Sequence, residues 1–371
     1  MLAENDNTTN VISTNPYIVA SDTRYPGASC FLYIPAESPN MVFVDSYHVV
    51  RAIAEWPVWR TPALPLPHHL SFRLEEIPGR GVGMIATRSI SAGELIFRER
   101  PVYAARREVN CAADQNDNGI FYRAAIHRLS QQARRSILGL QNAFPPPFDV
   151  VPGILNTNCL EIRITEKPDP KPSESFVGCF PVISRANHDC APVANYFFNF
   201  GTFEGELRAM NDIAGGEEIT ITYMDLCLPK AERQAYLSRT RYFTCGCATC
   251  STPAAELGQS DARRAQIGRL IERLDTLDTP HLPERSSLDE LERALAAAEE
   301  EGLVKEYARV LLIGSQVLTI YGDLHIAMNW AQRAKRLFIM VEGAGSYNVR
   351  RLEDAERVHS AMASAPRGLR I

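Results

Sequence analysis

A short run of cysteines constrains the fold of this chain more than any other feature. Cys245, Cys247 and Cys250 form a Cys-x-Cys-x-x-Cys motif that places three thiols on one loop. A structural zinc site closes a tetrahedron with four such ligands, so a fourth must come from elsewhere. Our choice is Cys190, the last residue of an Asn-His-Asp-Cys run. Two alternatives stay open: a disulfide between Cys247 and Cys250, or a site of three cysteines and His188.

The composition limits the class of protein. The chain has 371 residues, of which 45% are hydrophobic, so it can form two or three units with sizeable cores. A net charge of -5 argues against a general nucleic-acid-binding protein, although it is compatible with a basic peptide as partner. The first residues do not resemble a signal peptide, and no apolar run approaches the roughly 20 residues of a membrane span. We therefore expect a protein of the nucleus, the cytoplasm or both, with no membrane partner.

Two further motifs accompany the cysteines. Gly81-Val82-Gly83 lies between strand-like runs at 72–75 and 94–99. No helix follows it, so it is not a dinucleotide-binding fingerprint. It is either an ordinary glycine hairpin or a backbone that approaches a ligand where a Cβ would clash. Further along, a Gly-Glu-Glu-Ile-Thr-Ile-Thr-Tyr run ends at Tyr223.

In this order the motifs resemble SET domains of the SMYD type, which are lysine methyltransferases, over about residues 71–250. The resemblance implies an α+β fold, with a β-rich SET domain of small twisted sheets and a knot-like crossing of the Asn187-His188 and Tyr223 segments. It also implies that Cys190, Cys245, Cys247 and Cys250 bind a structural zinc ion (Zn2+). The cysteine-rich MYND finger of animal members is missing, as in some fungal SET proteins.

We expect three regions along the chain. Residues 1–70 form an N-terminal extension that is partly disordered, and residues 71–250 form the SET domain and its zinc-bound post-SET segment. A helical insertion lies at about 105–175, with one helix at 121–140 whose apolar face is Ile126, Leu129, Ala133, Ile137 and Leu140. Residues 251–371 form a helical, tetratricopeptide-like region, with helices at 267–277, 288–301, 304–321 and 325–340. This region is either a structural buttress or a surface for a protein partner.

The resemblance implies S-adenosylmethionine-dependent protein-lysine N-methylation, of a histone or another protein. A neutral amine attacks the sulfonium methyl, so the protein must align and desolvate the lysine. Tyr223 matches the catalytic tyrosine, and we assign it to orienting the reactants, because a phenol with a pKa of about 10 is a poor base at neutral pH. The implied cofactor-binding residues are Arg80, Gly81, Val82, Gly83, Asn158, Ser184, Asn187, His188, Tyr223 and Phe243. The implied substrate channel is Leu160, Tyr223 and Phe243.

Several departures from the family concern the substrate. Arg241 replaces a tyrosine expected two residues before Phe243, and Leu160 stands where an aromatic side chain often lines the lysine channel. Pro192 is followed by Val193 where an asparagine is common. The sequence therefore leaves the substrate and the number of methyl groups open. Two rival functions are a degenerate SET protein that binds partners without turnover, and a zinc-organised nucleic-acid-binding module, which requires a basic surface.

Overall fold

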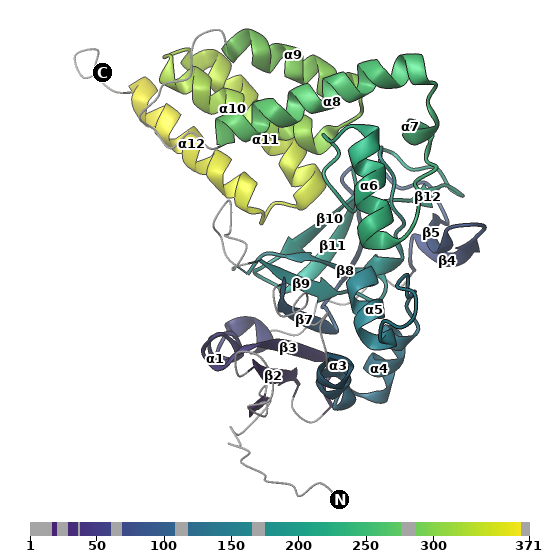
Figure 1. Ribbon diagram of the computed structural model, residues 1–371. Helices are drawn as coiled ribbons and strands as arrows, with labels where there is room; N and C mark the ends of the chain where they lie inside the picture. Colours follow the sequence, from purple (N-terminus) through teal and green to yellow (C-terminus); the bar gives the residue numbers. More distant parts are fainter. Residues whose placement is uncertain are drawn as a thin grey trace, which may run out of the picture. The chain divides into compact units, whose positions relative to one another are not determined.

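The computed structural model describes residues 17–20, 29–35, 38–60, 69–107, 118–164, 175–275 and 287–364 (Figure 1). Contacts divide the chain into two compact units. The first combines Met1–His69, Phe97–Arg185 and Phe198–Glu206, and the second combines Leu70–Ile96, Ala186–Phe197 and Leu207–Ile371. Most of the segment expected to be disordered, residues 1–16, lies outside the described residues, and the three expected regions stay a prediction. No described helix is both long and apolar enough to cross a membrane.

The first unit is built on a six-stranded sheet of order β1-β2-β3-β7-β9-β8. Its strands are β1 (Tyr17–Ala20), β2 (Ser29–Ile34), β3 (Met41–Ser46), β7 (Tyr103–Arg106), β8 (Cys159–Ile162) and β9 (Phe176–Cys179). Strand β3 runs parallel to β7, while the other neighbours pair antiparallel. The N-terminal extension thus supplies three strands, and the apolar runs of β2 and β3 are buried in the core.

Helices cover the core of this unit. They are α1 (Tyr47–Ala54), the 3-10 turn η1 (Pro57–Arg60), α3 (Asn118–His127), α4 (Gln131–Leu138) and α5 (Val150–Asn158), and the turn η3 (Ile183–Arg185) ends the segment Phe97–Arg185. The prediction of one helix at 121–140 is wrong, because the chain breaks before Ser130, whose side chain caps α4 by accepting a hydrogen bond from the Ala133 amide. The predicted apolar face is nevertheless buried across both helices.

The second unit contains a glycine hairpin that a third, short strand extends to a sheet. A sheet of order β12-β5-β4 joins β4 (Phe72–Ile77), β5 (Gly81–Ala86) and β12 (Glu218–Ile219). Gly79 and Gly81 in the turn have positive φ values of 75° and 71°, which explains the need for glycine there. A further three-stranded sheet has the order β10-β11-β6, from β10 (Ala194–Asn199), β11 (Glu204–Ala209) and β6 (Leu95–Glu99). The chain passes between the two units within these three strands.

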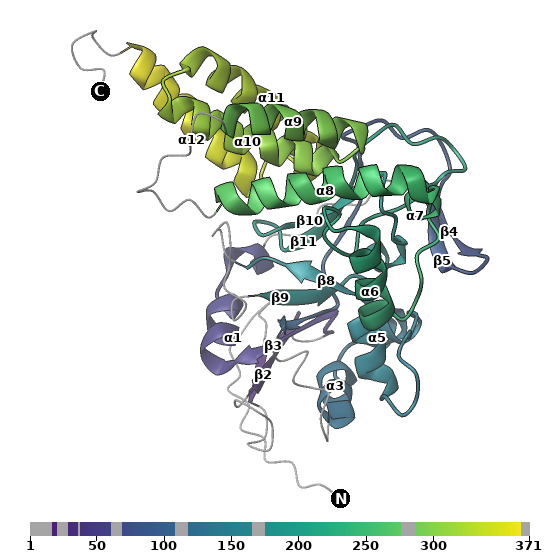
Figure 2. The same cartoon turned by 45° about the horizontal axis from the view of Figure 1, so that its top comes forward.

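The C-terminal part of the second unit is helical (Figure 2). The helices are α6 (Lys230–Arg241), α7 (Ala248–Ser251), α8 (Ala254–Asp275), α9 (Ser287–Glu300), α10 (Val304–Ile320), α11 (Leu324–Glu342) and α12 (Tyr347–Ser364). The four predicted helices are present, but α8 starts at Ala254 rather than Ile267, and α12 was not predicted. Helices α10 and α11 pack so closely that a Cβ on Gly314 would lie 2.2 Å from the Trp330 ring. This hairpin anchors the unit's helical core.

Candidate functional site

Two motifs that are distant in sequence pair in the second unit. The Ile221 amide donates to the Asn187 carbonyl at 2.9 Å, and the Asp189 amide donates to the Ile221 carbonyl at 3.0 Å. These bonds form an isolated parallel bridge between His188 and Ile221, directly after the short strand β12. The Asn-His motif therefore lies beside the segment that ends at Tyr223.

Tyr223 is fixed in this arrangement by its hydroxyl, which donates to the Ala186 carbonyl at 2.8 Å. Burial raises the pKa of Tyr223 to about 12, although the charges of Arg241 and Arg80 lower it. The phenol is therefore neutral at physiological pH, which fits an orienting role better than that of a base. The Arg241 guanidinium carbon lies 5.5 Å from the Tyr223 ring centroid, so the residue that departs from the family pattern contacts the candidate catalytic side chain.

His188 is buried, with 3% of its surface exposed, and both ring nitrogens are engaged. Its Nδ1 accepts from the Tyr223 amide at 3.2 Å, and its Nε2 lies 3.4 Å from the Cys190 sulfur. Since Nδ1 is an acceptor, the proton of the neutral ring is on Nε2 and points at the sulfur. Burial lowers the pKa of His188 to about 4, so the ring stays neutral. A protonated Nε2 cannot bind a metal ion, which disfavours the site of three cysteines and His188.

Arg80, Asn187 and Glu218 form a polar cluster around the glycine hairpin. The Glu218 carboxylate accepts from Asn187 Nδ2 at 2.9 Å and forms an ion pair with Arg80 Nη1 at 2.9 Å. Arg80 Nη2 also donates to the His188 carbonyl at 2.8 Å. A Cβ on Gly83 would lie 2.9 Å from Asn187 Nδ2 and 3.0 Å from Glu218 Oε1. Asn187 and Glu218 therefore lie too close to the Gly83 backbone for a side chain, which explains the second glycine of the motif. The predicted cofactor residues Gly81 and Val82 lie beside it in β5.

Sequence reasoning missed Glu218 as a site residue. It lies inside a motif that was recognised, but it follows another glutamate, Glu217, and nothing in the local pattern distinguishes the two. The difference is one of contacts, because Glu217 accepts a hydrogen bond from the nearby Ala214 amide instead.

Three predicted site residues lie in the first unit. Asn158 is buried, and its Nδ2 donates to the carbonyls of Gln141 and Ile154, each at 2.7 Å. The Ser184 hydroxyl donates to the Asn158 carbonyl at 2.8 Å, and Leu160 lies two residues after Asn158, in β8. The side-chain donors of Asn158 and Ser184 therefore hold the local fold, and their role in cofactor binding stays a prediction.

Phe243, the predicted channel aromatic, lies in the second unit shortly before the cysteine motif. Its ring centroid lies 6.4 Å from that of His188, at an interplanar angle of 57°. The side chain is 36% exposed, so part of it is available for contact. A partly exposed ring beside His188 fits the predicted role, which stays a prediction.

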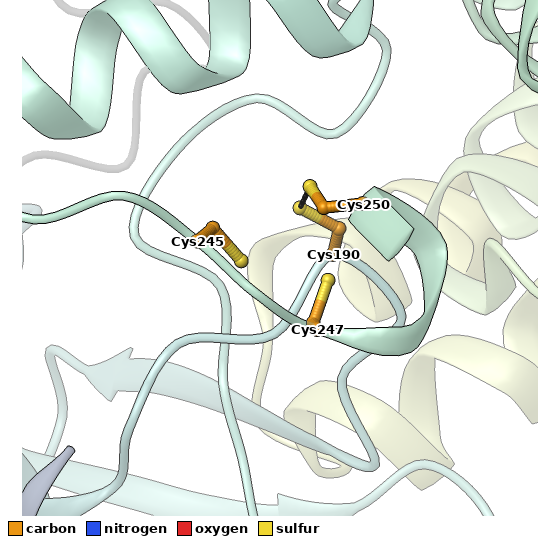
Figure 3. Close-up of side chains that lie close together, drawn as sticks. All are labelled: Cys190, Cys245, Cys247 and Cys250. Atoms are coloured by element: carbon orange, nitrogen blue, oxygen red, sulfur yellow. Dashed lines mark hydrogen bonds between the residues drawn. The ribbon is translucent and has the colours of Figure 1, made fainter. Parts of the chain in front are cut away.

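The four predicted zinc ligands meet in one cluster of the second unit. Cys190, Cys245, Cys247 and Cys250 are all buried, and their sulfur atoms lie within 4.8 Å of one another. Figure 3 shows them converging from the loop of the Asn-His motif, the loop that contains Cys245 and Cys247, and helix α7. All four are free thiols, so the alternative disulfide between Cys247 and Cys250 is not formed.

The cluster has the dimensions of a tetrahedral metal site. The sulfurs of Cys190 and Cys250 are 3.6 Å apart. Four sulfurs at about 2.3 Å from a zinc ion would be separated by about 3.8 Å. Hydrogen bonds from Cys190 and Cys245 lower the pKa of Cys247, which favours the thiolate form that binds metals.

A known protein family matches the part of the chain that contains these motifs. The family model described as "SET domain" matches residues 81–224. This chain contains a SET domain. The match covers Gly81 and Gly83, the Asn-His motif and Tyr223, and it ends before Cys245.

Two proteins that are similar to parts of this chain are named as histone-lysine methyltransferases. The histone-lysine N-methyltransferase set5 of Schizosaccharomyces pombe is 27% identical over 280 residues, which cover 74% of this chain and 80% of that protein. The human histone-lysine N-methyltransferase SMYD3 is 35% identical over 108 residues, which cover 29% of this chain and 24% of SMYD3. The chain thus spans most of set5 but only about a quarter of SMYD3. A solved SET domain of LSMT, bound to lysine and AdoHcy, is 11% identical, with a TM-score of 0.30 over 80% of this chain and 89% of that one.

Proposed function

We propose that this protein is an S-adenosylmethionine-dependent protein-lysine N-methyltransferase with a structural zinc ion. The observation that carries the proposal is the pairing of the Asn187-His188 segment with the segment of Tyr223, inside a matched SET domain. S-adenosylmethionine supplies the methyl group when bound, and the residues of this chain position, desolvate and orient the reactants.

The side-chain amide of Asn187 is oriented so that its oxygen can accept a hydrogen bond from a cationic group. Its Nδ2 is held by Glu218, so its orientation is fixed and Oδ1 faces away as a free acceptor among the described contacts. The α-ammonium group of an amino acid is a suitable donor for such an oxygen. Arg80 stabilises the same carboxylate and holds the His188 carbonyl, so one ion pair orients both residues of the motif.

Tyr223 is the candidate catalytic residue. Its neutral hydroxyl is held by the Ala186 carbonyl, which leaves the phenol oxygen as an acceptor toward an amine or a polarised methyl group. The amine loses its proton to solvent, because a phenol with a pKa of about 12 does not take part as a base at neutral pH. Its catalytic contribution is thus alignment of the two reactants.

A zinc ion at the cysteine cluster would stabilise the closing segment, residues 242–253. Cys245 and Cys247 lie in a loop without regular structure, and only helix α7, four residues long, follows before α8. Metal binding supplies folding energy to such a segment directly. We assign Cys190, Cys245, Cys247 and Cys250 as the ligands, since all four are buried and converge.

One experiment tests cofactor and metal together. Purified protein is titrated calorimetrically with S-adenosylmethionine, and zinc is quantified on the same sample. We expect one molecule of S-adenosylmethionine and one zinc ion per chain. Zinc without cofactor binding would support the rival function of a degenerate SET protein that acts through its partners.

A second experiment tests catalysis. Tyr223→Phe should retain cofactor binding and lower methyl transfer to a lysine peptide by about 100-fold, the usual cost of misalignment. Tyr321→Phe, in the helical region, is the matched control and should leave the rate unchanged. Equal rates for wild type and Tyr223→Phe would remove this residue from the mechanism.

The substrate is a lysine-containing protein. The relatives are named for histone lysines, so histone tails are the first peptides to test, followed by non-histone lysine peptides. We further propose action in the nucleus, the cytoplasm or both. Mass spectrometry of the methylated peptides would identify the target lysine and the number of methyl groups added.

A further inference from the structure

Arg241 is the last residue of helix α6, and its guanidinium carbon lies 5.5 Å from the centroid of the Tyr223 ring. That distance is within the roughly 6 Å of a cation–π contact. The two residues that follow, Tyr242 and Phe243, are 49% and 36% exposed. The ring centroid of Phe243 lies 6.4 Å from that of His188, which in turn lies 5.4 Å from that of Tyr223. A cation and a partly exposed aromatic side chain therefore lie close to the candidate catalytic residue.

Two hydrogen bonds hold the chain that follows Arg241 against helix α6. The Gln234 side chain donates from Nε2 to the Cys245 carbonyl at 2.7 Å, and its Oε1 accepts from the Cys245 amide at 2.9 Å. Between them, Tyr242 ends the helix with φ 57° and ψ 34°, a left-handed conformation that bulky residues rarely adopt. Such a conformation persists only where the surrounding structure imposes it. The end of α6, and with it the position of Arg241, is therefore well defined.

The charge of Arg241 acts on the Tyr223 hydroxyl. Burial has the largest influence on the pKa of Tyr223 and raises it to about 12, whereas the positive charges of Arg241 and, less strongly, Arg80 lower it. The negative charge of Glu218 raises it, but acts less strongly than either arginine. Glu218 is also engaged elsewhere, because it pairs with Arg80 and accepts from Asn187. These charges together make the surroundings of the phenol positive, and Arg241 contributes most.

A substrate lysine that reaches Tyr223 must enter this positive field. Its amine attacks in the neutral form, so the charges that Arg241 attracts or repels are those of the neighbouring residues of the substrate. These residues stay close to the site, since an extended chain spans only about 3.3–3.6 Å per residue. A carboxylate there can accept two parallel hydrogen bonds from the guanidinium group, whereas a second cation is repelled.

We propose that Arg241 selects the substrate, favouring protein segments in which an acidic residue lies directly beside the target lysine and disfavouring basic segments. The inference rests on the proposed methyltransferase activity and names a substrate class for it. Arg241 acts on the residues beside the lysine and not on the reacting atoms, so it determines specificity and is not a catalytic residue. The exposed rings of Tyr242 and Phe243 offer the same residues an apolar surface.

The test measures kcat/KM of the full-length protein for three versions of the lysine peptide that it methylates fastest. The versions differ only in the two residues that flank the lysine, which are both glutamate, both glutamine or both arginine. Arginine supplies positive charge without adding a second lysine. Arg241→Gln removes the charge of the side chain, and Arg241→Glu reverses it. Arg239→Glu is the matched control, because Arg239 is exposed in the same helix and residues two apart do not share a face.

We expect wild type to prefer the glutamate peptide over the arginine peptide by about tenfold, since attraction and repulsion between partly exposed charges each contribute a few-fold. Arg241→Gln should bring this ratio close to one, Arg241→Glu should invert it, and Arg239→Glu should keep it. If Arg241 only held Tyr223 in place, its loss would slow all three peptides equally and leave the ratio unchanged. The wild-type preference should also fall between about 0.1 and 1 M salt, as the Debye length shortens from about 10 to 3 Å.

Failure of this inference is distinct from failure of the proposed function. If wild type methylates the three peptides with equal kcat/KM, or if Arg241→Glu keeps the wild-type preference, Arg241 does not select the substrate. If the Arg241 variants do not fold, a wild-type preference that salt does not reduce leads to the same conclusion. If no lysine peptide is methylated at all, the proposed function is refuted, and the inference with it.

Discussion

At Gly83, a hydrogen atom in place of a side chain leaves room for the Asn187–Glu218 contact of the proposed cofactor site. A Cβ there would lie 2.3 Å from Ile77 Cδ1 and would push Asn187 away from Glu218. We expect Gly83→Ala to weaken S-adenosylmethionine binding at least about tenfold, since a hydrogen bond to a charged group contributes about 1.5–3 kcal/mol. Calorimetry measures the affinity.

Gly258→Ala is the control for this substitution, because a Cβ at Gly258 meets nothing within 4 Å and the residue lies in helix α8. If Gly83→Ala binds the cofactor as tightly as this control, the contact between Asn187 and Glu218 does not prepare the site.

Glu99 gives the first unit a pH dependence. The half-buried carboxylate accepts hydrogen bonds from the amides of Val182 and Ile183, at 2.8 and 2.7 Å. Burial nevertheless raises its pKa from 4.5 to about 7, while these hydrogen bonds lower it. The folded protein therefore holds a proton that the unfolded chain releases between these two pH values.

The free energy of unfolding should include a contribution from Glu99 that is fully present below about pH 4.5 and lost as the pH rises through 7. At about 1.4 kcal/mol per pKa unit, the loss is at most about 3 kcal/mol. Glu99→Gln keeps an acceptor for both amides and should abolish this part of the pH dependence. Urea unfolding at pH 5 and pH 8 measures it. A pH dependence equal in both proteins would show that Glu99 ionises normally.

At the scale of elements, an ion cluster connects helix α8 to the end of α9. Glu301 accepts from Arg264 Nε at 2.8 Å, from Arg263 Nε at 2.7 Å and from the Ser260 hydroxyl at 2.6 Å. Arg264 also donates to the carbonyl of Cys190. Removing one partner from a buried cluster leaves the other charge without compensation.

We therefore expect Arg264→Met to lower the free energy of unfolding by about 3–5 kcal/mol. Denaturant titration measures this change, and Arg269→Met, at an exposed position of the same helix, should change it by less than about 0.5 kcal/mol. Similar values for the two variants would mean that the cluster does not stabilise the unit.

The elements were predictable where the signal is local. The apolar periodicity of 304–321 and 325–340 predicted α10 and α11, and the same pattern predicted the buried face of α3 and α4. The break between α3 and α4 was missed, because one capping serine outweighed a continuous apolar stripe. The pairing of β3 with β7 was beyond prediction, since strands far apart in sequence leave no periodic signal of their partners.

At the scale of the whole molecule, the site residues also divide into those with a local sequence signal and those without one. The closing cysteines were recognisable from their spacing, and Cys190 joined them through a family resemblance; all four meet. Glu218 was not recognised, because its role depends on groups that folding brings near. One of two adjacent glutamates in a polar strand looks like an ordinary surface residue until its contacts are known.

Removal of zinc should loosen one part of the molecule selectively. None of the four candidate ligands lies in the first unit, while the closing cysteines connect directly to α7 and α8 in the second. Because metal binding supplies folding energy locally, chelation should speed hydrogen exchange most at residues 242–253. Strands β2 and β3 should keep their protection, as their hydrogen bonds do not involve the cluster. Hydrogen exchange by mass spectrometry, with and without chelator, measures both segments. Equal acceleration in both segments would show that the metal stabilises the whole chain instead of its closing segment.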